Sequence, residues 1–328
     1  MDTVTQFVLG AGVGAAVLGR LIGPRKAAIT GGLLGSVPDL DVLFPFDDPI
    51  DSFILHRGVT HAFLIHALAT PVFGEALVRL FKNLRDQRFR TYLAVFLIFV
   101  THAALDALTI YGTRIFWPLA PDPVGVGSIF IIDPLYTLPL LVITLWAFCA
   151  GTWSLRFSRA LTVALTLSTA YLGWGLLAQY WAKDKAETVL AQMGIQAERV
   201  FATPAPFSTF FWRVVAIDGN RYINLYLPLF GSTETPMAYV HPRGLEHLSC
   251  ADPLPAVQKL ADFSKGFYRV DEQDGEIRVS DLRMGLTPGY AFTFAVAQQN
   301  GDGLDPIPPR RIENSRRAEG DIDWLLAN

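Results

Sequence analysis

The chain has 328 residues, of which 51% are hydrophobic and only 17% are charged. Soluble domains carry about 25% charged residues, so this composition is typical of a membrane protein. The formal net charge of −3 lacks the basic excess of nucleic-acid-binding proteins, and no nucleic-acid partner is expected.

Apolar stretches recur through the first half of the chain, at roughly 7–22, 24–37, 61–81, 91–109, 133–151 and 160–182. The last four are about 20 residues long, which is enough to cross a hydrocarbon core about 30 Å thick. The first two are shorter and rich in Gly and Ala, which lets two helices approach closely. We therefore expect a polytopic bundle of about five or six membrane helices that starts with a short, tight hairpin.

Charges in the loops predict the orientation of this bundle. Every second loop is basic and carries Arg20, Arg25, Lys26, Lys82, Arg85, Arg88, Arg90, Arg156 or Arg159. The opposite face has only Arg57 and Arg114 in its loops, with Lys183 and Lys185 after the last helix. By the positive-inside rule the basic face is cytoplasmic. The non-cytoplasmic face then holds residues 38–60, 110–132 and 183–328.

Beyond residue 182 the pattern changes to that of a soluble, β-rich α+β domain. DKAETVLAQMG, at 184–194, predicts a short helix, and 252–266 predicts another. Aromatic and β-branched residues around Asp-Gly turns predict hairpins at 207–230 and 267–284, and 290–298 adds a strand. The predicted units are a membrane domain (1–182), a C-terminal domain (183–310) and a loosely held polar tail (311–328).

Acidic and histidine side chains gather at the predicted non-cytoplasmic ends of the helices. HRGVTHAFLIH, at 56–66, contains three of the six histidines, and PDLD at the end of the second stretch contains two acids. His102 and Asp106 lie four residues apart, which places both on one helical face. A charged carboxylate inside a bilayer costs at least about 2.5–3.5 kcal/mol, so such residues are functional candidates.

Mixed imidazole and carboxylate donors suit zinc, manganese or iron, and a cation would relieve the repulsion between the acids. We therefore predict a divalent metal site, with zinc preferred and one or two ions bound. The predicted ligands are Asp39, Asp41, His56, His61, His102 and Asp106. A spare carboxylate, Asp41 or Asp106, would manage the proton in catalysis. Arg57 and Arg114 would hold an anionic substrate group.

Three further residues have two interpretations each. Gln6 could supply an amide oxygen to the site or simply begin the first helix. His66 lies five residues beyond His61 and off its helical face, which favours a hydrogen-bonded core histidine over a ligand. Asp133 precedes a proline, so it is either a site residue or a helix N-cap.

Several stretches resemble the YdjM-type family of membrane-bound metal-dependent hydrolases. They are DTVTQFVLGAGVGAAVLGR, GSVPDLDVL, HRGVTHA, THAALDALTIYGTRIFWPL and SIFIIDPLYTLPL, which cover most of residues 1–150. FSKGFYRV and SDLRMG look more loosely like the domain that follows in longer members. The resemblance implies a hydrolase of the bacterial inner or plasma membrane that uses bound divalent metal, with the family's acid and histidine motifs falling on the ligands named above. Ala62 departs from the small hydroxyl residue that members often carry there.

The predicted mechanism is attack of a metal-activated water on an ester or phosphoester. A site at the membrane boundary favours a lipid or a lipid-linked phosphoester as the substrate. One alternative is a non-enzymatic membrane protein in which the metal is structural or lines an ion pathway. Another is a scaffold whose C-terminal domain binds a second envelope protein.

Overall fold

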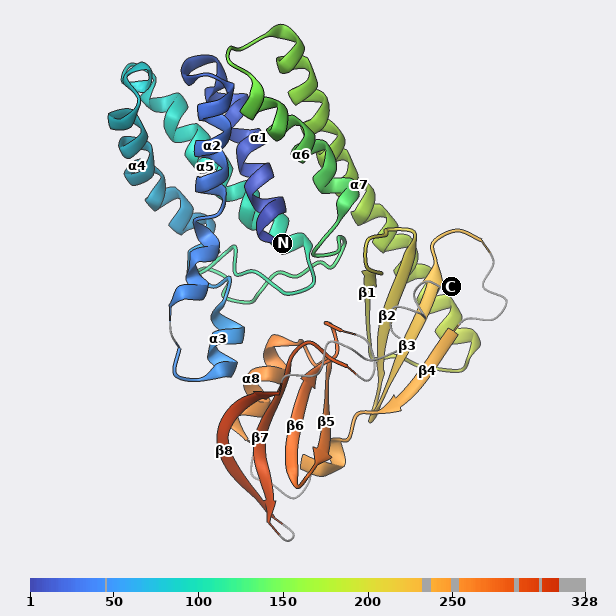
Figure 1. Cartoon of the computed structure of the whole chain (residues 1–328). Coiled ribbons are helices and arrows are strands. Elements are labelled where there is room, and N and C mark those ends of the chain that lie inside the picture. Colours follow the sequence, from blue (N-terminus) through green and yellow to red (C-terminus); the bar gives the residue numbers. More distant parts are fainter. Residues whose placement is uncertain (45, 232–236, 249–253, 286–288, 301–302, 313–328) are drawn as a thin grey trace.

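The computed structural model describes residues 1–44, 46–231, 237–248, 254–285, 289–300 and 303–312. A bundle of helices forms the N-terminal region, and two antiparallel sheets form the C-terminal region (Figure 1). The predicted fold class, a helical membrane bundle followed by a β-rich domain, is confirmed.

Long apolar helices build the bundle. Those long and apolar enough to cross a membrane are α1 (Thr3–Ile22), α4 (Phe63–Leu80), α5 (Arg88–Leu108) and α7 (Leu155–Gln192). Helix α6 (Pro134–Cys149) is apolar but shorter. Helix α2 (Pro24–Gly35) has 12 residues and is therefore about 18 Å long, too short to cross the membrane by itself.

Helices α1 and α2 form an antiparallel hairpin whose contact face is built from glycine. A Cβ atom on Gly31 would lie 2.2 Å from the carbonyl oxygen of Gly10, and one on Gly14 would lie 2.7 Å from that of Ala27. Only glycine allows two helix backbones to approach this closely. The tight hairpin that the sequence predicts is therefore present.

The two ends of the bundle differ in the segments they carry (Figure 1). The connections that follow α1, α4 and α6 lie at one end, and the basic residues of the predicted loops lie in these connections or in the adjoining helix ends. The N-terminus, α3 (Pro49–Leu55) and the short 3₁₀ helices η1 (Pro38–Leu43) and η2 (Val59–His61) lie at the other. The C-terminal sheets lie beyond this second end. Which end faces the cytoplasm stays a prediction.

Helix α7 connects the two regions without a break. It has 38 residues, so it is about 57 Å long and extends well past a hydrocarbon core of about 30 Å. The helix predicted at 184–194 is the continuation of α7, which ends at Gln192. Its last turns pack against the first sheet through Ala182, Ala186 and Val189. The predicted domain boundary at 182 thus falls within this helix and stays a prediction.

Each C-terminal sheet has four strands joined in chain order. The first contains β1 (Arg199–Pro204), β2 (Phe211–Asp218), β3 (Arg221–Pro228) and β4 (Met237–Pro242), and the second contains β5 (Tyr268–Gln273), β6 (Glu276–Asp281), β7 (Thr293–Asn300) and β8 (Gly303–Ile312). Both predicted Asp-Gly hairpins are present as β2–β3 and β5–β6. In the second hairpin Asp274 and Gly275 both have positive φ, as a two-residue type I′ turn requires.

The C-terminal end of the chain differs from the prediction. Residues 303–312 form β8 at the edge of the second sheet, so the first two residues of the predicted tail, Arg311 and Ile312, belong to a strand. An edge strand tolerates proline because one side of its backbone needs no ladder partner. The rest of the predicted polar tail, 313–328, lies outside the described residues.

The second sheet also packs against the helical region. Helix α8 (Pro255–Phe263), close to the helix predicted at 252–266, shares an apolar core with α3 and the inner face of this sheet. Phe53 of α3 stacks on Phe292 with ring centroids 4.2 Å apart and contacts Tyr111 at 5.3 Å. This contact places the C-terminal sheets over the bundle end that carries η1 and η2.

Candidate metal centre

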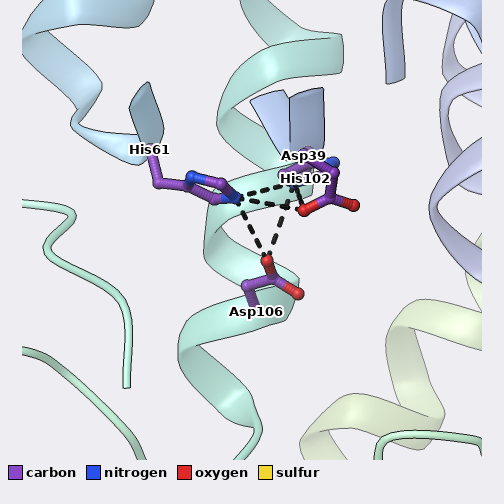
Figure 2. Close-up of side chains that lie close together, drawn as sticks. All are labelled: Asp39, His61, His102 and Asp106. Atoms are coloured by element: carbon purple, nitrogen blue, oxygen red, sulfur yellow. Dashed lines mark hydrogen bonds and ion pairs between the residues drawn. The ribbon is translucent and has the colours of Figure 1, made fainter. Parts of the chain in front are cut away.

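The side chains of Asp39, His61, His102 and Asp106 converge at the bundle end nearest the C-terminal sheets. Asp39 lies in η1, His61 in η2, and the other two lie one turn apart in α5. One potential ligand atom of each residue lies within 4.8 Å of the other three, and Figure 2 shows them facing one another. Three of these side chains are buried, whereas Asp39 remains 20% exposed.

The separations between these atoms match those of a four-coordinate metal site. Nε2 of His61 lies 3.2 Å from Nε2 of His102, 3.4 Å from Asp39 Oδ1 and 3.4 Å from Asp106 Oδ2. Nε2 of His102 lies 3.5 and 3.6 Å from the same two oxygens. A tetrahedron with ligands about 2.1 Å from its centre, typical of zinc, has edges of about 3.4 Å. The donor set therefore fits one ion.

Contacts on the far side of each imidazole fix which nitrogen carries the proton. Nδ1 of His102 lies 2.7 Å from the carbonyl oxygen of Gly35, which can only accept, so Nδ1 donates. The Thr60 hydroxyl donates to Asp41 at 2.9 Å and therefore accepts from Nδ1 of His61 at 3.0 Å. Both Nε2 lone pairs face the cluster, which is the state in which histidine binds a metal.

The two carboxylates of the cluster require a nearby positive charge. Asp39 Oδ1 and Asp106 Oδ2 are buried and accept no well-aligned hydrogen bond from the described residues, although both face the two histidines. Asp106 also contacts Arg57 and the Met1 amino group. A buried charged acceptor is costly without such compensation. Burial would raise the pKa of Asp39, but His102 and His61 outweigh it and hold this pKa below its usual range. Burial would lower the pKa of His61, but Asp106 and Asp39 raise it. The cluster attracts a cation, either a proton on His61 or a metal ion.

Asp41 and His56, also predicted as ligands, form a pair beside the cluster. Nδ1 of His56 lies 2.9 Å from Asp41 Oδ1. The other oxygen of Asp41 lies 3.7 Å from Nδ1 of His61, the nitrogen turned away from the cluster. Asp41 therefore contacts His61 from behind and helps to orient it, with Thr60 between them.

Arg57 connects this pair with the cluster. Its Nε lies 3.1 Å from Asp106 Oδ2, and its backbone N–H donates to Asp41 at 2.9 Å. Arg57 has a φ of +60°, a conformation that residues other than glycine rarely adopt. The backbone N–H of Arg114 donates to the Arg57 carbonyl oxygen and supports this conformation. Arg57 is thus placed at the site, whereas Arg114 supports it through its backbone.

The three residues with two interpretations take different places. Gln6 donates its amide N–H to Asp106 Oδ1 at 2.9 Å, so its nitrogen faces the cluster. His66 lies outside the four-residue group, and its Nε2 lies 2.9 Å from the Thr60 carbonyl oxygen. Asp133 is the N-cap of α6 and accepts from two backbone N–H groups of that helix.

Two groups that position the histidines were missed in the sequence. The Gly35 carbonyl oxygen has no sequence signal because every residue carries one. Thr60 directly precedes His61, and its hydroxyl could have been proposed as an orienting group. The amino group of Met1 also contacts the buried Asp106.

A cavity of about 860 Å³ adjoins the centre between the bundle end and the C-terminal sheets. Asp41, His56 and Arg57 line its helical side, and residues of both sheets line the opposite side. None of the four clustered donors lines this cavity, but Arg57 and Asp41, which line it, contact Asp106 and His61. The arrangement provides a buried metal-binding set next to a chamber large enough for a small ligand.

Four candidate membrane spans and a buried acid–histidine cluster at one bundle end define a polytopic membrane protein that could hold a metal ion. A model of the YdjM inner membrane protein family matches residues 1–182, more than half of the chain, and the chain belongs to that family. The matched region contains the whole cluster. The comparisons with curated proteins and with solved structures found no match.

Proposed function

We propose that this inner-membrane protein is a metal-dependent hydrolase that cleaves an ester or phosphoester bond. The observation that carries the proposal is the convergence of two imidazole and two carboxylate donors beside a large cavity. Intramembrane acids are costly, and a cation bound between them would compensate that cost.

Asp39, His61, His102 and Asp106 would hold a single ion, because one potential ligand atom from each lies within 4.8 Å of the others. Zinc suits this nitrogen and oxygen donor set, with manganese or iron as the alternatives. When bound, a divalent ion would act as a Lewis acid and lower the pKa of a coordinated water towards neutrality.

His56 is the residue best placed to move a proton. It lines the cavity with 23% of its side chain exposed, and its Nδ1 bonds to Asp41, which leaves the lone pair on Nε2. An Asp–His pair of this kind supports general base catalysis followed by proton return to the leaving group. The contacts favour His56 over Asp41 and Asp106 in this role, because the oxygens of both acids are already engaged.

Arg57 would hold an anionic group of the substrate. Its side chain is buried, lines the cavity and lies 3.1 Å from Asp106. A guanidinium at this position can bridge a ligand carboxylate of the centre and a phosphate or carboxylate in the cavity. The left-handed backbone of Arg57 supports a functional role, because such strain concentrates at active sites.

A structural ion is the competing proposal. Four protein ligands complete a tetrahedral shell, as they do in structural zinc sites. The exposed edge of Asp39 and the His56–Asp41 pair in the cavity favour catalysis instead. A partner envelope protein for the C-terminal domain stays a prediction, as does an ion pathway.

Metal content of the detergent-purified full chain, measured by mass spectrometry, is the first test. We expect about one equivalent of zinc, manganese or iron in the wild type, and its loss in His102→Ala. His66→Ala is the matched control because His66 is another buried histidine of the bundle but lies outside the four-residue group. It should keep the metal.

Hydrolysis of chromogenic phosphomonoesters, phosphodiesters and carboxylic esters is the second test. Metal-dependent turnover that is lost in His102→Ala and retained in His66→Ala would support the hydrolase. Stoichiometric metal without turnover of any ester class, together with unfolding when the metal is removed, would favour the structural ion.

A further inference from the structure

The cavity beside the metal centre has two chemically different walls. Its volume of about 860 Å³ lies at the upper end of the range for small-molecule sites, about 300–1,000 Å³. The helical wall carries Asp41, His56 and Arg57. The wall formed by the C-terminal sheets carries Arg213, Arg283 and Arg311. No other feature among the described residues places a chamber of this size against the centre.

Arg213 is a buried cation without a charged partner. Its side chain is 3% exposed, and its guanidinium donates to the Asn224 side-chain oxygen and to the carbonyl oxygens of Leu282 and Arg283. It forms no salt bridge with a carboxylate of the described residues. Neutral acceptors and the Tyr290 ring, whose centroid lies 6.0 Å from the guanidinium carbon, orient the side chain but supply no negative charge, which is costly in a buried position.

The other two arginines of the sheet wall have partners for their charge or their ring face. Arg283 forms a salt bridge with Asp281 at 2.7 Å. Arg311 is exposed, donates to the Ala291 carbonyl oxygen and stacks over Phe292 at 4.7 Å. The sheet wall therefore has an excess of positive charge that favours an anionic ligand.

The remainder of the cavity is apolar and aromatic. Phe53 of α3, Phe292 just before β7 and Phe294 in β7 line it, together with Ile129 and Phe130 from the loop before α6. Phe130 and Phe292 are partly exposed there, and a small hydrophilic anion such as free phosphate would leave their apolar surface uncovered. Their surface fits a hydrocarbon chain, because burial of apolar area is favourable at about 25 cal/mol per Å².

Exposed apolar residues also line the cavity next to the membrane bundle. Val42 and Phe44 line the cavity and are 65% and 64% exposed, and Phe46 beside them is 39% exposed. They follow directly on the segment that carries Asp39 and Asp41, at the end of the membrane bundle. Exposed apolar residues at this level are stable in contact with lipid.

We infer that the cavity binds an anionic amphiphile. Its phosphate is held by Arg213 and Arg57, and its hydrocarbon chain packs against the aromatic residues that line the cavity. One point of this inference, that the ligand is the substrate, rests on the proposed function. The C-terminal domain then forms half of the substrate site, and Arg213 is a substrate-binding residue contributed by that domain.

Binding to the full chain in detergent, followed by native mass spectrometry, tests this assignment. The probe is dioctanoyl phosphatidic acid, compared with dioctanoyl phosphatidylcholine and with glycerol 3-phosphate. The first comparison keeps the chains and neutralises the headgroup, whereas the second keeps the phosphate and removes the chains. We expect both alternatives to bind at least about tenfold more weakly, the size of one charge-assisted contact.

Arg213→Gln should weaken binding of phosphatidic acid by at least about tenfold. Arg243→Gln is the matched control, because Arg243 is another buried arginine of the C-terminal domain that donates to backbone carbonyl oxygens but does not line the cavity. It should change binding by less than about twofold. Arg311→Gln provides a second test if Arg213→Gln does not fold, since Arg311 is exposed at the cavity.

The outcomes separate this inference from the proposed function. Equal binding of phosphatidic acid and phosphatidylcholine, or unchanged binding in Arg213→Gln and Arg311→Gln, overturns the inference even if the wild type holds metal. Selective binding that persists in metal-free Asp39→Ala supports the cavity assignment. Selective binding to a wild type that carries no metal overturns the hydrolase and leaves the binding site in place.

Discussion

The metal centre and the sheet wall of the cavity differ in the sign of their buried charge, which is negative in the centre and positive in the wall. In the centre, two carboxylate oxygens and two imidazole lone pairs face one another, and among the described residues only Asp106 also contacts other cationic groups, those of Arg57 and Met1. In the sheet wall, Arg213 is buried among neutral acceptors. Burial makes an uncompensated group of either sign costly. The difference indicates that the two regions suit one assembly, a cation in the centre and an anion in the cavity.

The largest expected effect comes from pushing helices α1 and α2 apart. This change should disrupt the metal centre and leave the sheet wall of the cavity intact. A leucine at Gly31 would collide with the Gly10 backbone, so Gly31→Leu should destabilise the bundle by about 3 kcal/mol or more. The Gly35 carbonyl oxygen would then move away from His102, and metal should be lost. Thermal unfolding in detergent and metal content measure both effects.

Gly173→Leu is the control for this change. Gly173 lies in α7, and a Cβ atom there would meet nothing within 4 Å. The same substitution should therefore leave both the melting temperature and the metal content close to those of the wild type. Equal behaviour of the two variants would show that the glycine contact does not hold the centre together.

The next largest effect is expected for His56, which lies between the metal centre and the cavity. His56→Gln should lower kcat by about 10²–10⁴, the usual contribution of a general base, and leave the metal content unchanged because His56 is outside the donor set. Turnover and metal analysis on the same preparation provide the measurement. His247→Gln, a change in the short 3₁₀ helix η4 (Leu245–Leu248) of the C-terminal domain, is the control. Simultaneous loss of metal would instead make His56 a ligand.

Much of the fold could be predicted because its signals are local. Apolar runs of about 20 residues predict membrane helices, and Asp-Gly turns predict the β2–β3 and β5–β6 hairpins. Strands β1, β4 and β8 were missed. All three lie at sheet edges, where exposed side chains and prolines are tolerated and the pairing partner, rather than the local pattern, defines the strand.

The candidate site was predictable in its composition but not in its division of roles. The spacing of His102 and Asp106 places them on one face of α5, and both belong to the cluster. Asp39 and Asp41 are two residues apart in η1, yet one faces Nε2 of His61 and the other its Nδ1. Only the path of the chain around His61 determines that Asp39 faces the cluster and that Asp41 lies on the opposite side of the imidazole.

The smallest expected effect concerns Asp41, whose side chain contacts both the metal centre and the cavity. It contacts His61 of the centre from behind and His56 of the cavity directly. Asp41→Asn should weaken metal affinity by about 10–100-fold, as does the loss of other groups that orient a metal-binding histidine. Competition with a chromogenic chelator measures this affinity.

Asp47→Asn is the matched control for this last change, since Asp47 also lines the cavity but is exposed and is not part of the cluster. Complete loss of metal in Asp41→Asn would make Asp41 a ligand rather than an orienting residue. Unchanged affinity would mean that Thr60 alone holds His61 in place. A partial loss, accompanied by lower turnover through His56, is the result expected if one carboxylate links the centre to the cavity.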